Sequence, residues 1–325
     1  MTGASPPAPS GALLISSWVE ERYAAALDAA APGVPRVVLA PDGALRGDVA
    51  AVELAFLSGD LYPEHVRPFV LAVRDAPRLR WLHTFSAGVD NPWFQVLRQK
   101  GVRLTTSSGA QAVPIAHTVL LYLLALSRDL PAWMDAQRRR AWEPHELVDL
   151  QGLVLGVVGL GPIGLEVARL GAALGMRVVA ARRTPRGDEP CETWPLARLD
   201  ELCALADALV LALPLTDDTR HLLDTGRLAR MKRGAWLLNV GRGALVDESA
   251  LAEALRSGQL GGAGLDVFEV EPLPAESPLW DAPNVLVTPH NSGDTPANWP
   301  RASEIFLDNL GRLVRGEPLR NEVLA

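Results

Sequence analysis

The segment from Leu153 to Leu174 restricts the fold more than any other part of this 325-residue chain. An apolar run, Leu153–Val158, leads into a glycine pattern, and apolar residues at helical spacing follow it. Glycines at these positions allow a tight turn, a close backbone approach to a pyrophosphate and close packing of the helix. We therefore expect a dinucleotide at the helix N-terminus, although an ordinary glycine-rich turn is the alternative. The motif residues are Gly159, Gly161, Pro162, Ile163 and Gly164.

The end of the next expected strand, Arg177–Ala181, indicates which dinucleotide binds. NAD-binding chains usually place an acid about 20 residues after the glycines to bond the ribose 2′-hydroxyl. Between the glycines and Asp188 the only acid is Glu166, inside the helix. The loop instead offers three side-chain donors that suit a 2′-phosphate, namely Arg182, Arg183 and Thr184. The sequence favours NADP, with NAD possible, and in the alternative interpretation both arginines are solvated loop charges.

Three charged or titratable side chains follow short apolar runs further along the chain: Arg242, Glu271 and His290. Because the carboxyl ends of strands form the ligand crevice of an open α/β sheet, these side chains can converge there. Arginine holds a carboxylate with a rigid fork of donors, and histidine can give a proton to a carbonyl oxygen near neutral pH. Glu271, bonded to the other ring nitrogen, would fix the tautomer and favour the protonated imidazole. Together they predict reduction of a small charged carbonyl compound, whereas any one alone could be a surface or turn residue.

Composition limits the remaining possibilities. The length suits two domains, and 48% hydrophobic with 21% charged residues is ordinary for a globular enzyme. A net charge of −7 argues against a nucleic-acid partner, and no metal motif is present. The two cysteines, Cys191 and Cys203, form no CxxC pair, which favours the cytoplasm. Met1 to Ser10 lacks the apolar core of a signal peptide and is expected to fray, and the apolar stretch Val113–Leu126 is too short to span a membrane, so we expect a buried helix.

Apolar runs in the first third of the chain predict parallel strands separated by helices, and so a first α/β domain. These runs are Ala12–Ile15, Arg36–Leu39, Leu54–Leu57, Leu79–Leu82 and Val102–Leu104. Leu153 then begins a second doubly wound unit that carries the glycine motif. A helix is expected from Arg301 to Val314 near the end of the chain.

The ordered motifs of the second half resemble the D-isomer-specific 2-hydroxyacid dehydrogenase family, which includes glyoxylate/hydroxypyruvate reductases and phosphoglycerate dehydrogenases. The likeness extends over nearly the whole chain and is densest from Leu153 to His290. Besides the glycines, the matching motifs are Leu213-Pro214-Leu215-Thr216, Asn239 to Gly243, Leu251, Gly264 to Phe268, Glu271 to Pro274, Ser277 to Trp280 and Pro289-His290.

The resemblance implies a role for each site residue. Arg242 would bind the 2-oxo acid, His290 would be the acid/base and Glu271 its partner. Asp266 would face the nicotinamide carboxamide, and Leu213-Pro214 would belong to the cofactor site.

Upstream, Ser86-Ala87-Gly88-Val89-Asp90 is similar to the family loop that binds the substrate carboxylate. The resemblance assigns this contact to the backbone amides of Ala87 and Gly88, and a turn of small residues suits the task. It also implies that a Rossmann-type cofactor domain, residues 111–291, is inserted in a flavodoxin-like substrate-binding domain, residues 1–110 plus 292–325. Both would be doubly wound α/β domains with parallel sheets.

We therefore expect reduction of a small 2-oxo acid, similar to glyoxylate or hydroxypyruvate, to a D-2-hydroxy acid with NADPH. One alternative is an NAD-linked dehydrogenase working oxidatively. Another is a non-catalytic, cofactor-sensing scaffold, since transcriptional corepressors that resemble this family keep the fold. The resemblance also implies a homodimer through the long connecting helix and the segment after it, where Trp133 and Trp142 lie, although both could pack within one subunit.

Two departures from the family pattern lie near the expected domain junction. Thr106 stands where an asparagine is common, and His117 stands where a glutamate is common. Because His117 is on an apolar helix, we expect a packed or hinge histidine rather than a second catalyst.

Overall fold

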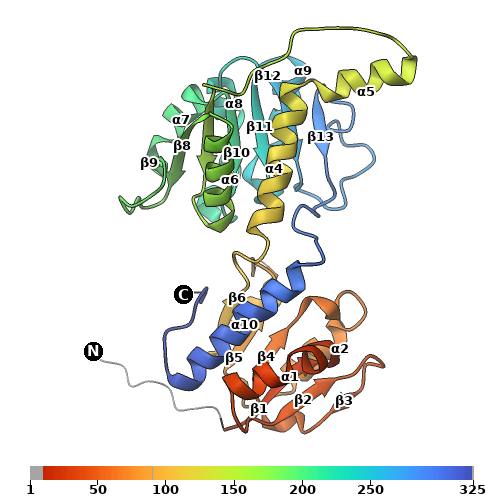
Figure 1. Cartoon of the computed structure of the whole chain (residues 1–325), viewed down its shortest axis with the longest axis vertical. Helices are drawn as coiled ribbons and strands as arrows, with labels where there is room; N and C mark the ends of the chain where they lie inside the picture. The colour runs from red at the N-terminus through yellow and green to blue at the C-terminus, as the bar shows by residue number, and fades with distance from the viewer. Residues whose placement is uncertain (1–9, 90, 324–325) are drawn as a thin grey trace. The chain divides into compact units, whose positions relative to one another are not determined.

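The computed structural model describes residues 10–89 and 91–323. Apart from Ser10, the expected N-terminal tail lies outside the described residues. The chain divides into two compact units, one comprising residues 1–110 and 295–325 and the other residues 111–294 (Figure 1).

The first unit contains a six-stranded sheet in the order β3-β2-β1-β4-β5-β6. All neighbouring strands are parallel except the short β3, which pairs with β2 in antiparallel fashion. Without β3, the order is that of a flavodoxin-like doubly wound sheet. The strands are β1 (Ala12–Ser16), β2 (Arg36–Leu39), β3 (Leu45–Arg46), β4 (Val52–Leu57), β5 (Trp81–Thr84) and β6 (Arg103–Thr106).

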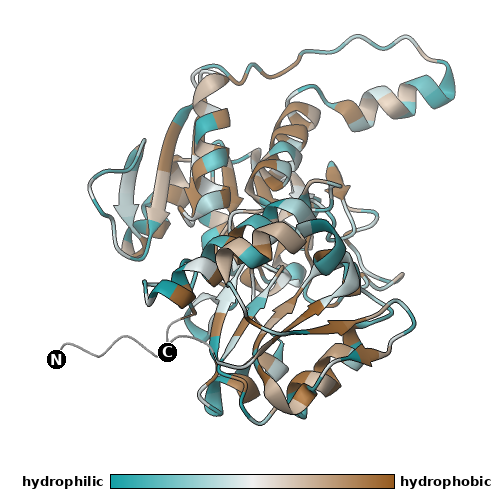
Figure 2. Cartoon of the chain, turned by 60° about the horizontal axis from the view of Figure 1, so that its bottom comes forward, coloured by the Kyte–Doolittle hydropathy of each residue, from teal (hydrophilic) through white to brown (hydrophobic). Residues whose placement is uncertain are grey.

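Alternate strand residues pack against helices on both faces of this sheet, so the unit is doubly wound. Helices α1 (Ser17–Ala30) and α10 (Asn298–Arg315) share one core with β1, β4 and β5. Helices α2 (Val66–Arg74) and α3 (Pro92–Gln99) share the other. Hydrophobic residues are concentrated on the strands between them (Figure 2). The burial of apolar surface on both faces drives this arrangement.

The second unit contains a seven-stranded, fully parallel sheet in the order β13-β12-β11-β10-β7-β8-β9. The chain starts at β7, proceeds to one edge, and returns to β10 to build the other half. Such a reversal leaves a crevice at the carboxyl ends of the two central strands, where ligands bind. The strands are β7 (Val154–Val158), β8 (Arg177–Arg182), β9 (Glu192–Pro195), β10 (Ala208–Leu211), β11 (Ala235–Asn239), β12 (Leu260–Leu265) and β13 (Val285–Val287).

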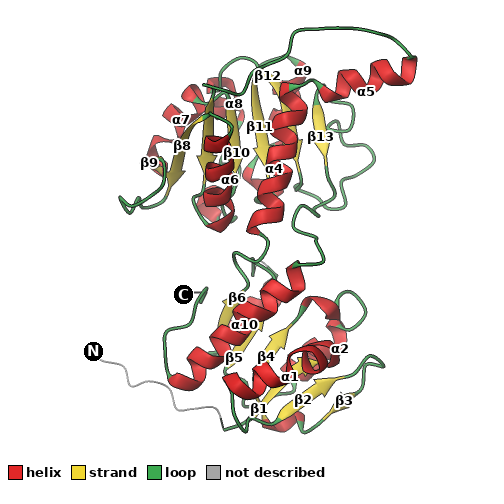
Figure 3. Cartoon of the chain, in the orientation of Figure 1, coloured by secondary structure: helices red, strands yellow, loops and turns green. Residues whose placement is uncertain are grey.

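Helices cover both faces of the second sheet as well (Figure 3). Helices α4 (Ala112–Ser127) and α6 (Pro162–Ala173) pack on one face. The other face is covered by α7 (Leu199–Leu205), α8 (Thr225–Arg230) and α9 (Glu248–Arg256). Helix α5 (Leu130–Arg139) extends away from the sheet beyond the end of α4 (Figure 1).

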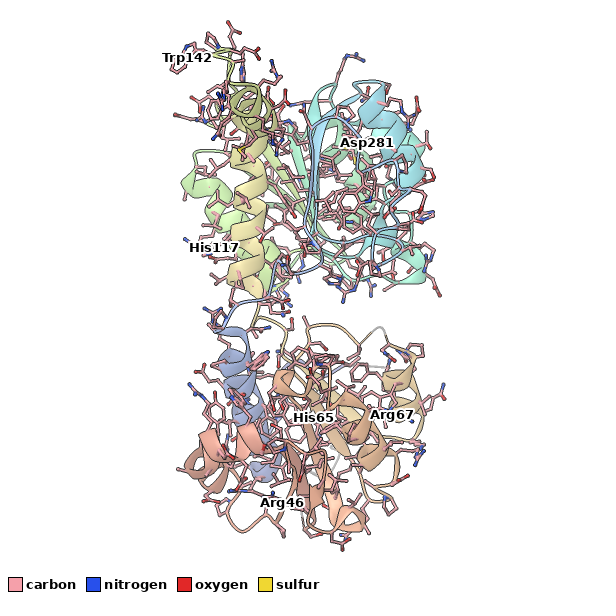
Figure 4. All side chains as sticks on the ribbon, turned by 90° about the vertical axis from the view of Figure 1, so that its right-hand side faces the viewer. Arg46, His65, Arg67, His117, Trp142 and Asp281 are labelled. Carbon is pink, nitrogen blue, oxygen red and sulfur yellow. The ribbon has the colours of Figure 1, made fainter. Side chains whose placement is uncertain are left out.

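Some features of the structure differ from the sequence expectations. The strand expected at Leu79–Leu82 begins at Trp81, and β3 was not predicted because two residues are too few for a periodic signal. His117 is exposed on α4 (Figure 4), so it is not packed within the chain, and its role as a hinge histidine stays a prediction. Its helix is mostly apolar and packs against the sheet and α6, but these leave His117 exposed.

Within the described part of the chain, no single helix has the length and apolar character required to cross a membrane. Helices α4 and α5 meet that requirement jointly, by length and composition only, but they are bent by 62° relative to each other.

Candidate active site

The glycine loop after β7 has the backbone that its sequence predicts. Gly159 has a φ of +95°, and a Cβ there would lie 2.5 Å from the carbonyl oxygen of Ala212. A Cβ on Gly164 would lie 2.0 Å from the carbonyl oxygen of Gly159, so a side chain at either position would disrupt the turn. Gly161, by contrast, has open space where its Cβ would be. The loop is therefore closed toward the protein at Gly159 and Gly164 and open toward solvent at Gly161.

A cavity of about 530 Å³ lies over this loop at the switch point of the sheet. It brings together the glycine loop, the end of β8 and the loop after β10. Its walls include most of the residues predicted to bind the cofactor, namely Gly159, Gly161, Arg182, Arg183, Thr184, Leu213 and Pro214. Pro162 begins α6, and Ile163 packs against the core beneath, so neither lines the cavity.

The arginines at the end of β8 differ in their surroundings. Arg182 Nη1 lies 3.2 Å from Glu189 Oε1. The Glu189 carboxylate also accepts hydrogen bonds from the amides of Arg186 at 2.7 Å and Gly187 at 2.8 Å. These backbone hydrogen bonds lower the pKa of Glu189 and keep it ionised. Arg183 is exposed and makes no ion pair with any described residue.

The loop that carries Arg242 is built by its neighbours. Asn239, buried at the end of β11, accepts a hydrogen bond from the Gly241 amide at 3.1 Å and donates one to the Arg242 carbonyl at 2.9 Å. A Cβ on Gly243 would lie 1.8 Å from the carbonyl carbon of Phe268, so only glycine fits. The Arg242 guanidinium is partly buried and donates to the Gly241 carbonyl at 2.7 Å. Backbone packing thus fixes the position from which Arg242 extends.

The structure brings Glu271 and His290 into direct contact. His290 Nδ1 lies 2.7 Å from Glu271 Oε2, and the other oxygen of Glu271 accepts a hydrogen bond from the Phe268 amide at 2.9 Å. The His290 side chain is 49% exposed, and no described residue bonds its Nε2. Glu271 therefore orients the imidazole by one nitrogen and leaves the other available to a ligand.

A mainly apolar cavity of about 460 Å³ adjoins this pair. Besides Glu271 and His290, its walls are Phe268, Pro272, Leu273, Trp280, Val287 and Pro289. The pair therefore stands at the edge of a hydrophobic recess.

Asp266 holds the segment on both sides of His290, a role that the sequence did not reveal. Asp266 is 1% exposed, and its carboxylate accepts hydrogen bonds from Thr288 Oγ1 at 2.6 Å, from the Asn291 amide at 3.1 Å and from the amide and hydroxyl of Ser292. His290 lies between these anchors with a φ of +52°, an unusual conformation for a residue other than glycine. Such strain persists only where the surroundings impose it, and the Asp266 hydrogen bonds do so here.

The hydrogen bonds of Asp266 continue to α4. The Tyr122 hydroxyl bonds Thr288 Oγ1, which in turn donates to Asp266. Burial raises the pKa of Tyr122, so its phenol stays protonated and can donate to Thr288.

In the first unit, the loop after β5 presents two backbone donors. Among the described residues, the amides of Ala87 and Gly88 donate to no protein acceptor. Two hydrogen bonds hold this loop. Ser86 Oγ donates to the Gly88 carbonyl at 2.8 Å, and the Ser107 amide, from the segment after β6, donates to the Ser86 carbonyl at 3.0 Å. Consecutive free amides in a rigid turn suit an anion. Asp90 lies outside the described residues.

The remaining polar groups of the described residues do not form a metal site. No group of three or more histidine, cysteine or acidic residues that could hold a metal occurs in residues 10–89 and 91–323. Cys191 and Cys203 are both free thiols. Thr106, at the end of β6, is buried, and its carbonyl accepts a hydrogen bond from the Asn321 side chain at 3.2 Å.

The fold and the glycine loop define a dinucleotide-binding α/β protein. Residues 120–292 match the family model described as D-isomer specific 2-hydroxyacid dehydrogenase, NAD binding domain. The chain belongs to this family.

Curated relatives of similar and of greater length match the chain. Glyoxylate/hydroxypyruvate reductase B of Pectobacterium carotovorum is 38% identical over 257 residues, which cover 77% of this chain and 80% of the relative. D-3-phosphoglycerate dehydrogenase of Methanocaldococcus jannaschii is 34% identical over 257 residues, and the match covers 77% of this chain but 48% of that protein. The chain thus spans about half the length of the latter relative.

Solved structures match nearly the whole chain. A D-isomer specific 2-hydroxyacid dehydrogenase from Xanthobacter autotrophicus, in complex with NADPH and MES, is 36% identical with a TM-score of 0.78, covering 97% of this chain and 98% of that one. An NADPH-dependent glyoxylate/hydroxypyruvate reductase from Sinorhizobium meliloti, in complex with NADP and sulfate, is 30% identical with a TM-score of 0.76, covering 96% and 97%.

Proposed function

We propose that this protein is an NAD(P)-dependent reductase of small 2-oxo acids that forms D-2-hydroxy acids, with NADPH as the favoured cofactor. The contact of 2.7 Å between His290 Nδ1 and Glu271 Oε2 carries the proposal. It provides an oriented acid/base on the same sheet as a cavity suited to a dinucleotide. The named reductases among the relatives support the same activity.

Each proposed residue has a distinct task. In the first unit, the Ala87 and Gly88 amides are donors for a carboxylate. In the second unit, the Arg242 guanidinium binds the 2-oxo acid and polarises its carbonyl oxygen. A bound reduced nicotinamide supplies the hydride that adds to C2. His290 donates the proton from Nε2 to the carbonyl oxygen, which completes the hydroxyl group. Glu271 keeps the imidazole oriented through Nδ1.

The second unit would serve as the cofactor domain and the first as the substrate-binding domain. The glycine loop with the N-terminus of α6 fits a pyrophosphate, since Gly161 is open to the cavity and no side chain caps the helix. Asp266 would hold the His290 segment. Because it is buried and its carboxylate accepts from Thr288, Asn291 and Ser292, a nicotinamide carboxamide would have to replace one of these donors.

Retention of Arg242, Glu271 and His290 does not by itself separate a catalyst from a cofactor-sensing scaffold, so turnover decides between them. An NAD-linked enzyme working oxidatively is the second candidate. Initial rates with NADPH and NADH against glyoxylate, hydroxypyruvate, pyruvate and bulkier 2-oxo acids test the proposal. We expect saturable NADPH oxidation with the small acids, and its absence with all of them would refute the proposal.

The ion pair between Arg182 and Glu189 leaves Arg183 as the main candidate for contact with a 2′-phosphate. Arg183→Ala should therefore raise the KM for NADPH about tenfold, since charge-assisted hydrogen bonds to phosphate are stronger than neutral ones. The KM for NADH should not change. Arg169→Ala is the control, because Arg169 is exposed on α6, pairs with Glu166 and does not line the cavity. If Arg183→Ala changed the KM for NADPH and for NADH equally, Arg183 would not contact the 2′-phosphate.

We propose a homodimer that uses the outer face of α4 and the arm formed by α5. Val113, His117, Leu121 and Leu124 form an exposed stripe on α4, and Trp142 is 96% exposed at the far end of the arm (Figure 4). Contiguous exposed apolar residues of this kind mark protein interfaces. We also propose the cytoplasm as the compartment, because both cysteines are free thiols.

Leu121→Glu should convert the dimer to a monomer, because it places a charge in the middle of the apolar stripe. Light scattering at micromolar concentration measures this change as a halving of the mass. Val96→Glu is the matched control, since Val96 is also about half exposed but lies on α3 of the other unit. If the parent protein had the mass of a monomer, the proposed homodimer would be refuted.

A further inference from the structure

A fully buried histidine, His83 on β5, lies directly beneath the loop proposed to bind the substrate carboxylate. Its side chain is 0% exposed and packs among Phe56, Trp81 and Phe306. Burial lowers the pKa of His83 to about 3, so the imidazole is neutral at physiological pH. One ring nitrogen then donates a hydrogen bond and the other accepts one.

The neighbours of His83 determine which nitrogen carries the proton. Ser107 Oγ donates to the Thr84 carbonyl at 3.0 Å, so it accepts from His83 Nε2, which lies 2.9 Å away. Trp81 Nε1, which can only donate, bonds Thr105 Oγ1 at 2.9 Å. The Thr105 hydroxyl is then free to donate to His83 Nδ1 at 2.7 Å. The opposite tautomer would leave the buried Thr105 hydroxyl hydrogen with no acceptor among the described residues.

The resulting chain of hydrogen bonds runs from the core to the substrate loop. It starts at Trp81, passes through Thr105, His83 and Ser107, and ends at the Thr84 carbonyl. The Ser107 amide also donates to the carbonyls of Thr84 and Ser86, each at 3.0 Å. The backbone immediately before Ala87 and Gly88 is therefore fixed by Ser107, and the Ser107 hydroxyl is fixed by His83.

We propose that His83, as the neutral Nε2–H tautomer, is a positioning residue: through Ser107 it fixes the backbone of Thr84–Ser86 and so aims the Ala87 and Gly88 amides at the substrate carboxylate. His83 touches neither substrate nor cofactor in this role. The inference rests on the proposed function for the identity of the anion, but the tautomer and the hydrogen-bond chain do not depend on it.

The kinetic test uses Ser107→Ala, which removes the hydroxyl that connects His83 to the loop. The KM for the 2-oxo acid should rise roughly five- to thirtyfold, the equivalent of about 1–2 kcal/mol for one buried hydrogen bond. The Kd for NADPH, measured by fluorescence without substrate, should not change. Phe306→Leu is the control for packing, because Phe306 contacts the same imidazole without a hydrogen bond. It should lower the melting temperature and leave the KM unchanged.

The spectroscopic test determines the tautomer of His83 directly and does not require a measurement of enzymatic activity. In protein with ¹⁵N-labelled histidine, the signal that disappears in His83→Gln should show a protonated Nε2 and an unprotonated Nδ1, unchanged between about pH 5 and 8. Thr105→Val should disturb this pattern, because it removes the donor to Nδ1, and Thr105→Ser should restore it. A signal that titrates in this range, or that shows a protonated Nδ1, would refute the tautomer.

The two tests separate the failure of this inference from that of the proposed function. If the parent reduces 2-oxo acids but Ser107→Ala has a normal KM, or raises it no more than Phe306→Leu, His83 is only a core residue. If the parent reduces none of them, the proposed function fails, while the tautomer is still decided by the NMR measurement.

Discussion

His290→Ala should reduce the turnover of 2-oxo acids by about 10²–10⁴-fold, the usual contribution of a positioned general acid. Glu271 holds Nδ1 of His290 at 2.7 Å, so the exposed Nε2 is the group that can give the proton. The variant removes this donor and leaves the glycine loop and its cavity in place. Stopped-flow or steady-state rates measure the loss, and the Kd for NADPH should stay within about twofold of the parent.

His221 provides a matched control for this experiment. It also has a positive φ, of 48°, and its Nε2 lies 3.1 Å from a carboxylate oxygen of Glu269. It lines neither the cofactor cavity nor the recess beside His290. His221→Ala should therefore leave turnover nearly unchanged. Similar losses in the two variants would mean that the effect comes from the fold rather than from proton transfer.

Arg242→Lys should lower kcat/KM for 2-oxo acids roughly ten- to hundredfold, although the charge is kept. A lysine is a point charge and cannot reproduce the planar, bidentate contact to a carboxylate, and a charged hydrogen bond contributes about 1.5–3 kcal/mol. The loop cannot shift to compensate, because Asn239 clamps it and Gly243 packs against the Phe268 backbone. The comparison requires full kinetics with both cofactors at saturation.

Arg256→Lys, at the exposed end of α9, is the control for the general effect of this substitution. It should behave like the parent. If Arg242→Lys retained the parent value of kcat/KM, Arg242 would not be the substrate anchor.

Local patterns in the sequence were sufficient to predict the parallel sheets and the glycine loop. The run from Leu153 to Val158 and the glycines after it lie within a dozen residues. Gly159 and Gly164 have no room for a side chain, and Gly161 is open to the cavity. Register and the order of strands agree with a doubly wound fold because short βαβ connections permit few alternatives.

Contacts that depend on how the chain turns back on itself could not be predicted in the same way. Glu189 pairs with Arg182 only because the loop after β8 turns back, so the sequence suggested two free arginines where the structure has one. Asp266 and Ser292 meet across the ends of β12 and β13. No periodic signal connects such pairs, since their proximity is set by tertiary packing.

The exposure of His117 shows a related limit of prediction from sequence. An apolar helix predicts that its surface is buried, but it does not show whether the residues that bury it belong to the same chain. On α4, the sheet covers one face, and the face with His117 and Leu121 is exposed in the single chain. A second copy of the chain packed on this face would bury it, as the apolar helix predicts.

The handedness of the product tests the central claim most directly. Purified protein is incubated with NADPH and hydroxypyruvate, and the glycerate formed is separated on a chiral column, with His290→Ala as the negative control. We predict D-glycerate in an amount equal to the NADPH oxidised, and little product from the variant. L-glycerate, or an equal yield from His290→Ala, would contradict the assignment of the reaction to this site.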